Sequence, residues 1–410
     1  MRILMLSAEY PPNMVGGLGK HVESLSLALT VLGVEVVLVT PRDRGGVPEE
    51  RPTTGLTVYR VEIPPGRTGS LLSDTQAMND ELMRAAEGII AATGPVDLIH
   101  AHDWLVASVA VRLKHLWHVP LLVTIHATER GRYQGELPSE LSRKINEIED
   151  ELIKEAWRVI VTSYFMAHEL VAFFGTSNDK LDVIPNAVDT SPYDGLHRAE
   201  LAEFRRQFAA DDENIVFYVG RVVYEKGLQV LVAASPQILT YSPKTKFVIA
   251  GRGPMADELR LQAERLGVGQ RFYFTGFIAD EDRDKLFVVA DVASFPSLYE
   301  PFGIVALEAM AARVPVVVSA VGGLTEVVEN HVTGILAVAN NPDSLAWAIV
   351  HTLSRPDWSA ARVENAYRRV IEQFSWPHVT QQEKRIYQRV VEECAADPWC
   401  RGASKEGQDG

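Results

Sequence analysis

The sequence of 410 residues has few cysteines and no long apolar run. Cys394 and Cys400 are the only cysteines and lie near the C-terminal end, which excludes a disulfide framework and a cysteine-rich metal site and is typical of a reducing compartment. No apolar run approaches the roughly 18 residues that cross a bilayer, and the first apolar stretch is too short for a signal-peptide core. We therefore expect a soluble, cytoplasmic protein, and a peripheral contact with a membrane stays open.

Basic residues are also in the minority. The chain has 40 Lys and Arg against 54 Asp and Glu, with a formal net charge of −14. Because binding to a phosphate backbone generally needs a basic surface, this balance excludes nucleic acid as the principal partner. It says nothing against a neutral carbohydrate. The 47% hydrophobic and 23% charged residues are ordinary for a globular chain of two or three domains.

Short apolar runs alternate with helical patterns along the chain, which predicts an α/β fold with parallel sheets covered by helices. The clearest helix has an apolar stripe from Leu18 to Leu32 and ends at Gly33. The charged segment 190–214 has no predicted strand, so we expect it to connect two halves. Twelve strands, too many for one sheet, are predicted from RILML, VEVVLVT, VDLIHA, PLLVTIH, RVIVTS and DVIPN, and then from NIVFYVG, KFVIAG, RFYFTG, VASFPS, VPVVVS and GILAV.

The segment PSLYEPFGIVALEAM carries the strongest functional signal. Gly303 permits a close approach of the backbone, and the amides of Ile304 and Val305 would point outward from a helix N-terminus, which suits an anion such as a nucleotide diphosphate. Glu300 precedes the turn and Glu308 lies within the helix, so both can approach one ligand. Two glutamates alone are more often a solvent-exposed pair than a ligand-binding pair. The other motifs of the sequence are therefore needed to distinguish these two interpretations.

A basic pair follows a predicted buried strand at residues 215–219. Ligands of open α/β sheets bind at the carboxyl ends of strands. There Arg221 offers a planar fork for phosphate oxygens and Lys226 a point charge, which together could neutralise a diphosphate leaving group without a metal. Such residues are more often plain surface charges, but their position ahead of the glutamate segment favours a functional role.

Two further motifs lie in the first half of the chain. In PPNMVGGLGKHVESL, Gly16 and Gly17 would let a loop pass close to a phosphate or sugar. A dinucleotide-binding fingerprint is the competing interpretation, but Val22 occupies the place of its third glycine. In VDLIHAHDW, His100 and His102 occupy alternate positions of a strand and lie on the same face, which suggests a metal site as one hypothesis. Because no third ligand is evident nearby, we predict no metal.

These motifs together resemble those of the retaining nucleotide-sugar glycosyltransferases of the GT-B fold, in the group of glycogen and starch synthases. The resemblance covers nearly the whole chain and includes VGGLTEVV at 321–328. Most of the motifs occur in the same order as in the family. It implies two Rossmann-like, doubly wound parallel-sheet domains that face a central cleft. The implied segments are an acceptor-side domain at 1–195, a nucleotide-sugar-binding domain at 196–375, a helix at 376–395 that crosses back to the first domain, and a mobile tail at 396–410.

The same resemblance implies roles for individual residues. His102 would contact the donor sugar, and His126, beside HATERGRYQG, would lie on the acceptor side. Glu300 would stabilise the sugar near its anomeric centre, and Glu308 would bind the ribose. The family usually has Lys two residues before its first glycine, whereas this chain has Met14. The catalytic set is Glu300, His102, Arg221 and Lys226, and the donor is bound by Gly16, Gly17, Arg221, Lys226, Gly303, Ile304, Val305 and Glu308.

The implied activity is retaining transfer of a hexose, preferentially glucose, from a nucleoside-diphosphate sugar to a glucan or another carbohydrate acceptor, with no metal or other cofactor. Transfer of glucose or mannose to a small molecule or lipid remains an alternative. A GT-B protein that binds a nucleotide sugar without transferring it and a dinucleotide oxidoreductase are alternatives of other classes. The sequence leaves open the base, the sugar, the acceptor and the oligomeric state.

Overall fold

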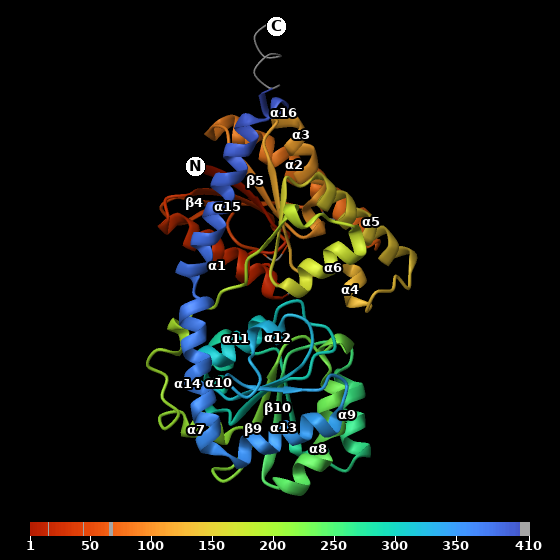
Figure 1. Ribbon diagram of the computed structural model, residues 1–410, viewed down its shortest axis with the longest axis vertical. Helices are drawn as coiled ribbons and strands as arrows, with labels where there is room; N and C mark the ends of the chain where they lie inside the picture. Colours follow the sequence, from red (N-terminus) through yellow and green to blue (C-terminus); the bar gives the residue numbers. More distant parts are fainter. Residues whose placement is uncertain (15, 44, 65–68, 402–410) are drawn as a thin grey trace, which may run out of the picture. The chain divides into compact units, whose positions relative to one another are not determined.

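The computed structural model describes residues 1–14, 16–43, 45–64 and 69–401. The chain divides into two compact units: Met1–Pro185 with the chain from Trp376 onward, and Asn186–Ser375 (Figure 1). The first unit ends at 185 rather than at the predicted 195. The difference arises because the residues after Pro185 pair with the second unit: Val188 donates its backbone N–H to Phe374 O at 2.9 Å.

Unit 1 is built on an eight-stranded sheet in the order β3-β4-β2-β1-β5-β6-β7-β8. Its pairs are parallel except for β3 and β4. The central strands are buried on both faces, as their continuous apolar runs predict. The strands are β1 (Arg2–Leu6), β2 (Glu35–Pro41), β3 (Glu49–Thr53), β4 (Leu56–Val61), β5 (Leu98–His102), β6 (Leu121–Ile125), β7 (Arg158–Val161) and β8 (Leu181–Val183).

All twelve predicted strands are confirmed, and two more, β3 and β4, were not predicted. The sequence of β3, EERPT, is charged, mostly exposed and contains Pro52, which is typical of an edge strand rather than of an apolar run. In β4 buried and half-buried residues alternate, a pattern of period two that a search for continuous apolar runs overlooks.

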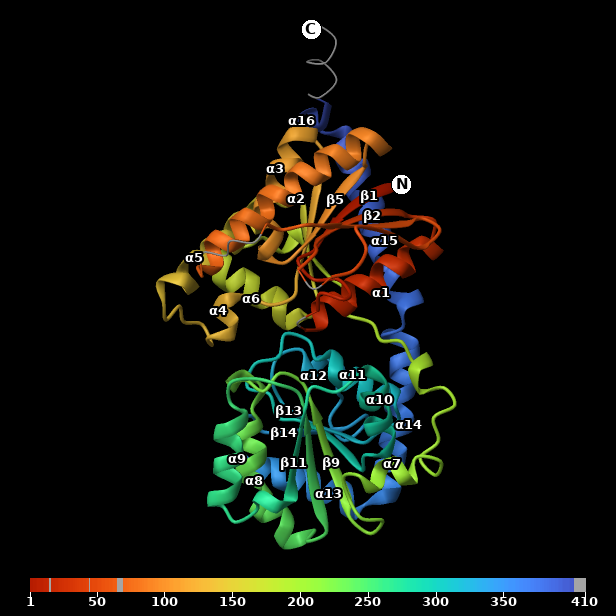
Figure 2. The same ribbon diagram turned by 180° about the vertical axis from the view of Figure 1, so that it is seen from behind.

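Helices cover both faces of this sheet. Helices α2, α3 and α5 pack in series on one face, and α1 packs against α15 on the other (Figure 2). The predicted stripe of α1 is confirmed, since Val22, Leu25 and Leu29 are fully buried. The helices of unit 1 are α1 (Gly17–Val31), α2 (Leu71–Thr93), α3 (Ala107–Trp117), α4 (Glu129–Arg132), α5 (Glu140–Glu155), α6 (Tyr164–Phe174), α15 (Trp376–Ala396) and α16 (Pro398–Arg401).

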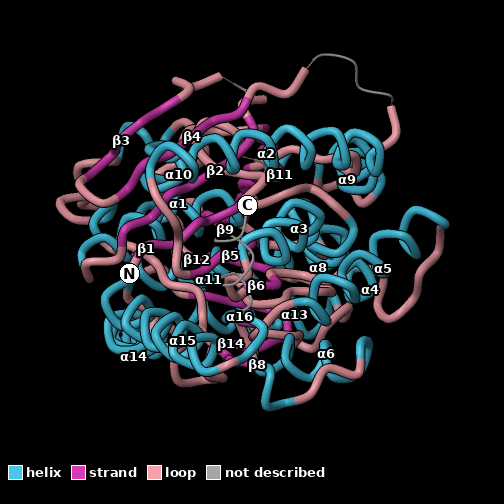
Figure 3. The backbone as a smooth tube through the Cα atoms, turned by 90° about the horizontal axis from the view of Figure 1, so that it is seen from above, coloured by secondary structure: helices cyan, strands magenta, loops and turns pink. Residues whose placement is uncertain are grey.

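Unit 2 contains a six-stranded, all-parallel sheet in the order β11-β10-β9-β12-β13-β14. Its buried core takes residues from the strands and from the surrounding helices. Figure 3 marks the helices in cyan and the strands in magenta. The strands are β9 (Asn214–Val219), β10 (Thr245–Ala250), β11 (Phe272–Gly276), β12 (Val292–Phe295), β13 (Val316–Ser319) and β14 (Ile335–Ala337). The helices are α7 (Ala202–Arg206), α8 (Leu228–Tyr241), α9 (Ala256–Arg265), α10 (Asp280–Val289), α11 (Ile304–Ala311), α12 (Leu324–Val327), α13 (Pro342–Ser354) and α14 (Pro356–Gln373).

The C-terminal segment corrects two predictions. Cys394 and Cys400 form a disulfide, although the sequence analysis expected no disulfide framework. Helix α15 reaches Ala396 and α16 follows, where the Trp399 ring lies 5.3 Å from Lys114 Nζ, so the first residues of the tail that was predicted to be mobile are helical and packed. Residues 402–410 of that predicted tail lie outside the described residues. No helix in the described ranges is long and apolar enough to cross a membrane.

Candidate active site

The sheet of unit 2 changes direction between β9 and β12. Strands β9, β10 and β11 follow one another to one edge, and β12, β13 and β14 follow to the other. In open α/β sheets, ligands bind outside the carboxyl ends of the strands at such a switch point. Lys226 lies in the turn after β9, and Glu300 lies in the loop after β12. Two of the predicted site residues therefore flank this point.

Lys226 and Glu300 form an ion pair. The distance from Lys226 Nζ to Glu300 Oε2 is 2.8 Å, and Ser297 Oγ donates a second hydrogen bond to the same oxygen at 3.1 Å. The side chains of Lys226 and Glu300 are only 18% and 9% exposed. A carboxylate this buried needs its charge compensated, so the pair positions a cation at the switch point. The sequence analysis predicted both residues but not their pairing.

Backbone contacts hold the two loops together. Leu298 and Tyr299 donate their backbone N–H groups to Glu225 O at 2.8 and 3.2 Å. Gly227 has a φ of +69°, and a Cβ there would lie 1.8 Å from Pro296 O. Only glycine fits both this left-handed backbone and this close approach. The glycine after Lys226 therefore lets the turn after β9 press against the loop after β12.

The turn that opens α11 is built in the same way. Gly303, at the N-terminal end of α11, has a φ of +107°, and a Cβ there would lie 2.5 Å from Leu324 Cδ2. Gly323 of the predicted second glycine loop donates its N–H to Glu300 O at 2.9 Å. Ile304 and Val305 occupy the first turn of α11, where backbone N–H groups have no acceptor within the helix. This geometry suits an anion at the end of the helix.

Glu308 is buried inside α11 and lies close to an arginine. Arg283 Nη1 of α10 is 3.8 Å from Glu308 Oε1, and the same guanidinium lies 2.8 Å from Asp284 Oδ1. Burial, with a further contribution from the Glu308 charge, raises the pKa of Tyr193 well above its ordinary value. The sequence analysis missed Arg283, because a helix rich in both signs of charge gives no sign of which side chain turns inward.

Arg221 is the most exposed of the predicted charged residues. Its side chain is 43% exposed and its guanidinium lies 3.2 Å from Glu225 Oε1. Its carbonyl oxygen accepts a hydrogen bond of 2.9 Å from the Tyr218 hydroxyl. An ion pair this exposed contributes little and leaves the guanidinium able to reorient. The structure thus anchors the backbone of Arg221 while its side chain lies at the surface.

In unit 1, the corresponding switch point lies between β1 and β5. Gly16 and Gly17 begin the helix after β1 and are exposed. Gly16 has a φ of −155°, an extended conformation that any residue adopts, and donates its N–H to Glu9 Oε2 at 3.1 Å. The backbone geometry therefore does not require glycine at position 16. The predicted close approach of the donor remains the proposed explanation for Gly16.

His100, in β5, ties the C-terminal helix to the sheet. Its ring nitrogens lie 2.7 Å from Tyr387 Oη of α15 and 2.8 Å from Thr124 Oγ1. The Tyr387 hydroxyl donates to Glu383 Oε2 at 3.2 Å, which leaves its oxygen able to accept from His100 Nδ1–H. Burial lowers the pKa of His100 well below its ordinary value, so the imidazole is neutral near pH 7. Burial raises the pKa of Glu383 to about 8. Neither Tyr387 nor Glu383 was predicted, because contacts across 287 residues leave no local signal.

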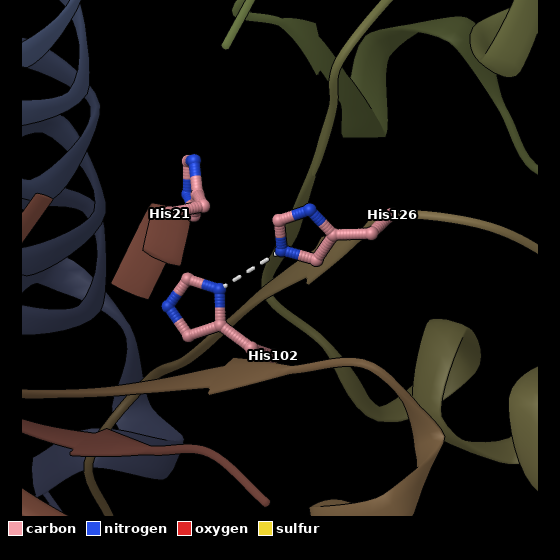
Figure 4. Close-up of side chains that lie close together, drawn as sticks. All are labelled: His21, His102 and His126. Atoms are coloured by element: carbon pink, nitrogen blue, oxygen red, sulfur yellow. Dashed lines mark hydrogen bonds between the residues drawn. The ribbon is translucent and has the colours of Figure 1, made fainter. Parts of the chain in front are cut away.

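His102 and His126 lie side by side. His102 Nδ1 is 3.2 Å from His126 Nε2 (Figure 4), although one was assigned to the donor and the other to the acceptor side. His126 donates its backbone N–H to Asp103 Oδ1 at 2.7 Å, and Asp103 has a φ of +60°, which is uncommon for a residue other than glycine. Burial lowers the pKa of His126 to about 4 and, with the neighbouring His100, lowers that of His102. Both rings are therefore neutral near pH 7.

His21, in α1, joins this pair and was missed by the sequence analysis. Its ring centroid lies 5.6 Å from that of His102 and 4.8 Å from that of His126. The letters GKH at the start of a helix at a switch point could have indicated it. The three histidines come from residues 21, 102 and 126, so their meeting depends on the sheet order.

Comparison with known proteins gives a consistent picture. Residues 201–369 match the family profile described as glycosyl transferases group 1, and residues 15–192 match glycosyltransferase family 4. The chain is 39% identical to an uncharacterized glycosyltransferase of Methanocaldococcus jannaschii over 96% of this chain and 99% of that protein. It is 36% identical to a glycogen synthase of Mycobacterium tuberculosis over 94% of each. A solved sucrose-phosphate synthase of Thermosynechococcus elongatus superimposes with a TM-score of 0.81 at 27% identity, over 96% of this chain and 99% of that one.

Proposed function

The chain belongs to the GT-B glycosyltransferases of the glycogen and starch synthase-like family, and on this premise we propose that it transfers a hexose, preferentially glucose, from a nucleoside-diphosphate sugar to a glucan or another carbohydrate acceptor with retention of configuration. Its membership makes it a transferase. The donor, the acceptor and the stereochemistry are the proposal.

The Lys226–Glu300 pair is the observation that carries this proposal. It places an ammonium group 2.8 Å from a carboxylate, largely out of water, at the switch point of unit 2. As the bond to the diphosphate breaks, negative charge grows on the leaving oxygen, and a cation already held in a protected site stabilises that charge without reorganisation. Glu300 supplies the opposite charge for a sugar that becomes cationic at its anomeric carbon.

Two further groups support an anion at the same edge of the sheet. The first-turn amides of Ile304 and Val305 lie at the N-terminus of α11, where the helix dipole favours negative charge. Arg221 can leave its exposed contact with Glu225 at little cost and close on a phosphate with two parallel hydrogen bonds. This arrangement needs no metal to neutralise the diphosphate.

Sugar contacts are assigned to neutral histidines of unit 1. With a lowered pKa, His102 and His126 each offer one N–H donor and one lone pair, which suits the hydroxyl groups of a sugar. Glu308 would accept hydrogen bonds from the ribose. In this proposal the acceptor hydroxyl attacks from the face of the leaving group, and catalysis rests on positioning and electrostatics rather than on a protein nucleophile.

A small-molecule or lipid acceptor is the second candidate, favoured by the segment after His126. The segment HATERGRYQG forms α4 (Glu129–Arg132) and then a turn in which Gln134 has a φ of +55°. Tyr133 is 48% exposed. A loop of this shape after His126 would influence which acceptor molecule can bind beside that residue.

A screen of nucleoside-diphosphate sugars against glucan and small acceptors tests the function, with proton NMR of the first-formed product. An α-linked product from an α-linked donor supports retention, and a β-linkage would overturn the mechanism. Arg221→Ala and Lys226→Ala should each lower turnover at saturating donor by roughly a hundredfold, or about 3 kcal/mol. Lys244→Ala is the matched control, because Lys244 forms an exposed pair with Asp212. Near-normal turnover in both test variants would refute the diphosphate assignment.

A further inference from the structure

Three histidines, of which His21 and His102 are buried and His126 is half-buried, converge at the switch point of unit 1. His21 lies in α1, which follows β1, His102 ends β5, and His126 follows β6. Each offers one ring nitrogen such that the three nitrogens lie within 4.8 Å of one another. Figure 4 shows His102 and His126 joined by a hydrogen bond, with the ring of His21, seen edge-on, beside them. Because they come from neighbouring elements of the sheet, the fold itself brings them together.

We propose that His21, His102 and His126 form a binding site for one divalent transition-metal ion that prefers imidazole ligands, with Zn²⁺ as the first candidate. Three protein nitrogens leave a fourth position of a tetrahedral ion for water or a ligand. Zn–N bonds of about 2.05 Å at a tetrahedral angle place two nitrogens about 3.3 Å apart. The nitrogens of His102 and His126 are already 3.2 Å apart.

Burial makes the cluster a better ligand set. Because His21 and His102 are buried and His126 is half-buried, the surrounding protein limits the access of water to the ring nitrogens. His102 Nε2 is buried and has no hydrogen-bond partner among the residues that the structure describes. With Nδ1 as the coordinating atom, Nε2 would carry the proton of the neutral ring.

Neighbouring residues hold the ligands in place. The backbone of His126 is fixed by Asp103. The ring of His102 packs on that of His100, with centroids 4.2 Å apart, and His100 is itself anchored by Tyr387 and Thr124. Such support is what metal sites need around their ligands. The ligand set contains no carboxylate, which favours Zn²⁺, Co²⁺, Ni²⁺ or Cu²⁺ over Mg²⁺ or Ca²⁺.

The proposed ion has no part in neutralising the diphosphate, which is assigned to residues of unit 2. This inference goes beyond the proposed function. It uses two of the rings that the proposed function assigns to sugar hydroxyls, so an ion and a sugar would compete for them, and metal binding is therefore measured with neither donor nor acceptor present.

The test is a titration of tag-free, full-length, metal-stripped protein with Co²⁺ and Zn²⁺. We expect one ion per chain, the visible absorption bands of four-coordinate Co²⁺, and a higher melting temperature with Zn²⁺ because the ion binds the folded state. His21→Gln, His102→Gln and His126→Gln should each weaken binding by about a hundredfold or more. His168→Gln is the matched control, because His168 is an exposed histidine of α6 in the same unit. It should bind as the wild type does.

Two outcomes would overturn the site. One is the absence of stoichiometric Co²⁺ or Zn²⁺ binding, and the other is wild-type affinity in folded His21→Gln and His126→Gln variants. X-ray absorption of the zinc-loaded wild type guards against a variant that fails to fold, since it counts imidazole ligands without any substitution. We expect three histidine ligands, and a shell of oxygen atoms or of one histidine would refute the proposal.

Discussion

The Lys226–Glu300 pair can be tested by a double-mutant cycle on stability, with no substrate present. Lys226→Met keeps the length of the side chain and removes its charge, and Glu300→Gln keeps the shape of the carboxylate and removes its charge. At 2.8 Å and an effective dielectric constant of about 20, the gross attraction is about 6 kcal/mol. Desolvation of both groups and the ordering of the lysine offset much of it.

The size of each effect follows from burial. Lys226→Met leaves the buried Glu300 carboxylate without its lysine partner but with the hydrogen bond from the Ser297 hydroxyl. The variant should lose about 3 kcal/mol of the free energy of unfolding. Glu300→Gln leaves the less buried ammonium beside an amide oxygen, at a cost of about 1–2 kcal/mol. The double variant should lose about 2 kcal/mol, less than the sum, because neither charge is left alone. The expected coupling energy is therefore about 2–3 kcal/mol.

Urea unfolding, followed by circular dichroism and by intrinsic fluorescence, measures the four free energies, and the two probes check whether the transition is two-state. Lys244 and Asp212 serve as a control cycle, because their contact is as short but both side chains are 65% exposed. Their coupling should be small, because solvent screens an exposed pair and the two long side chains lose freedom in forming it. A coupling for Lys226 and Glu300 no larger than that of the control pair would refute the claim that the site holds a buried ion pair.

Three more outcomes are expected. Transfer activity should persist in excess chelator, because side-chain cations and helix amides are proposed to neutralise the diphosphate; loss of activity that Mg²⁺ or Mn²⁺ restores would contradict this. Gly227→Ala should lower the unfolding midpoint much more than Gly175→Ala, since both glycines have a positive φ but only at Gly227 would a Cβ meet backbone, 1.8 Å from Pro296 O; equal shifts would count against the packing argument. The pKa of Glu383 is about 8 in the folded protein, against an ordinary value of 4.5. Its contribution to stability is therefore complete below pH 4.5 and is lost as the pH rises to 8, by at most roughly 5 kcal/mol. Glu383→Gln should therefore gain stability relative to the wild type across that range in urea unfolding at several pH values, and a difference that does not change with pH would exclude a raised pKa.

Local patterns predicted most of the fold. Continuous apolar runs predicted every strand that is buried on both faces, and the stripe from Leu18 to Leu32 predicted α1, because these features depend on residues close in the chain. The β3–β4 hairpin escaped prediction because an edge strand has little apolar surface to bury. The disulfide between Cys394 and Cys400 also escaped, since composition alone argued for reduced thiols.

For the candidate site, too, the sequence indicated some features and the structure alone showed others. The residue types and the order of the motifs were enough to select Arg221, Lys226, Glu300 and the glycines around them. The sequence could not say that Lys226 pairs with Glu300, that Arg221 stays at the surface, or that Glu308 lies near Arg283. The two pairs join segments that the chain separates and that only tertiary packing brings close, with 2.8 Å between Lys226 and Glu300 and 3.8 Å between Arg283 and Glu308.

The sequence by itself predicted two α/β units, because strand periodicity is a local property, and the glycosyltransferase class followed from the resemblance of its motifs to those of a known family. Tertiary structure alone decided which side chains meet. The order of the strands places β1, β5 and β6 side by side, and for that reason His21, His102 and His126 share one buried space although up to 105 residues separate them (from 21 to 126). Long-range pairing of this kind depends on how sheets and helices close around a core, which no short stretch of sequence records.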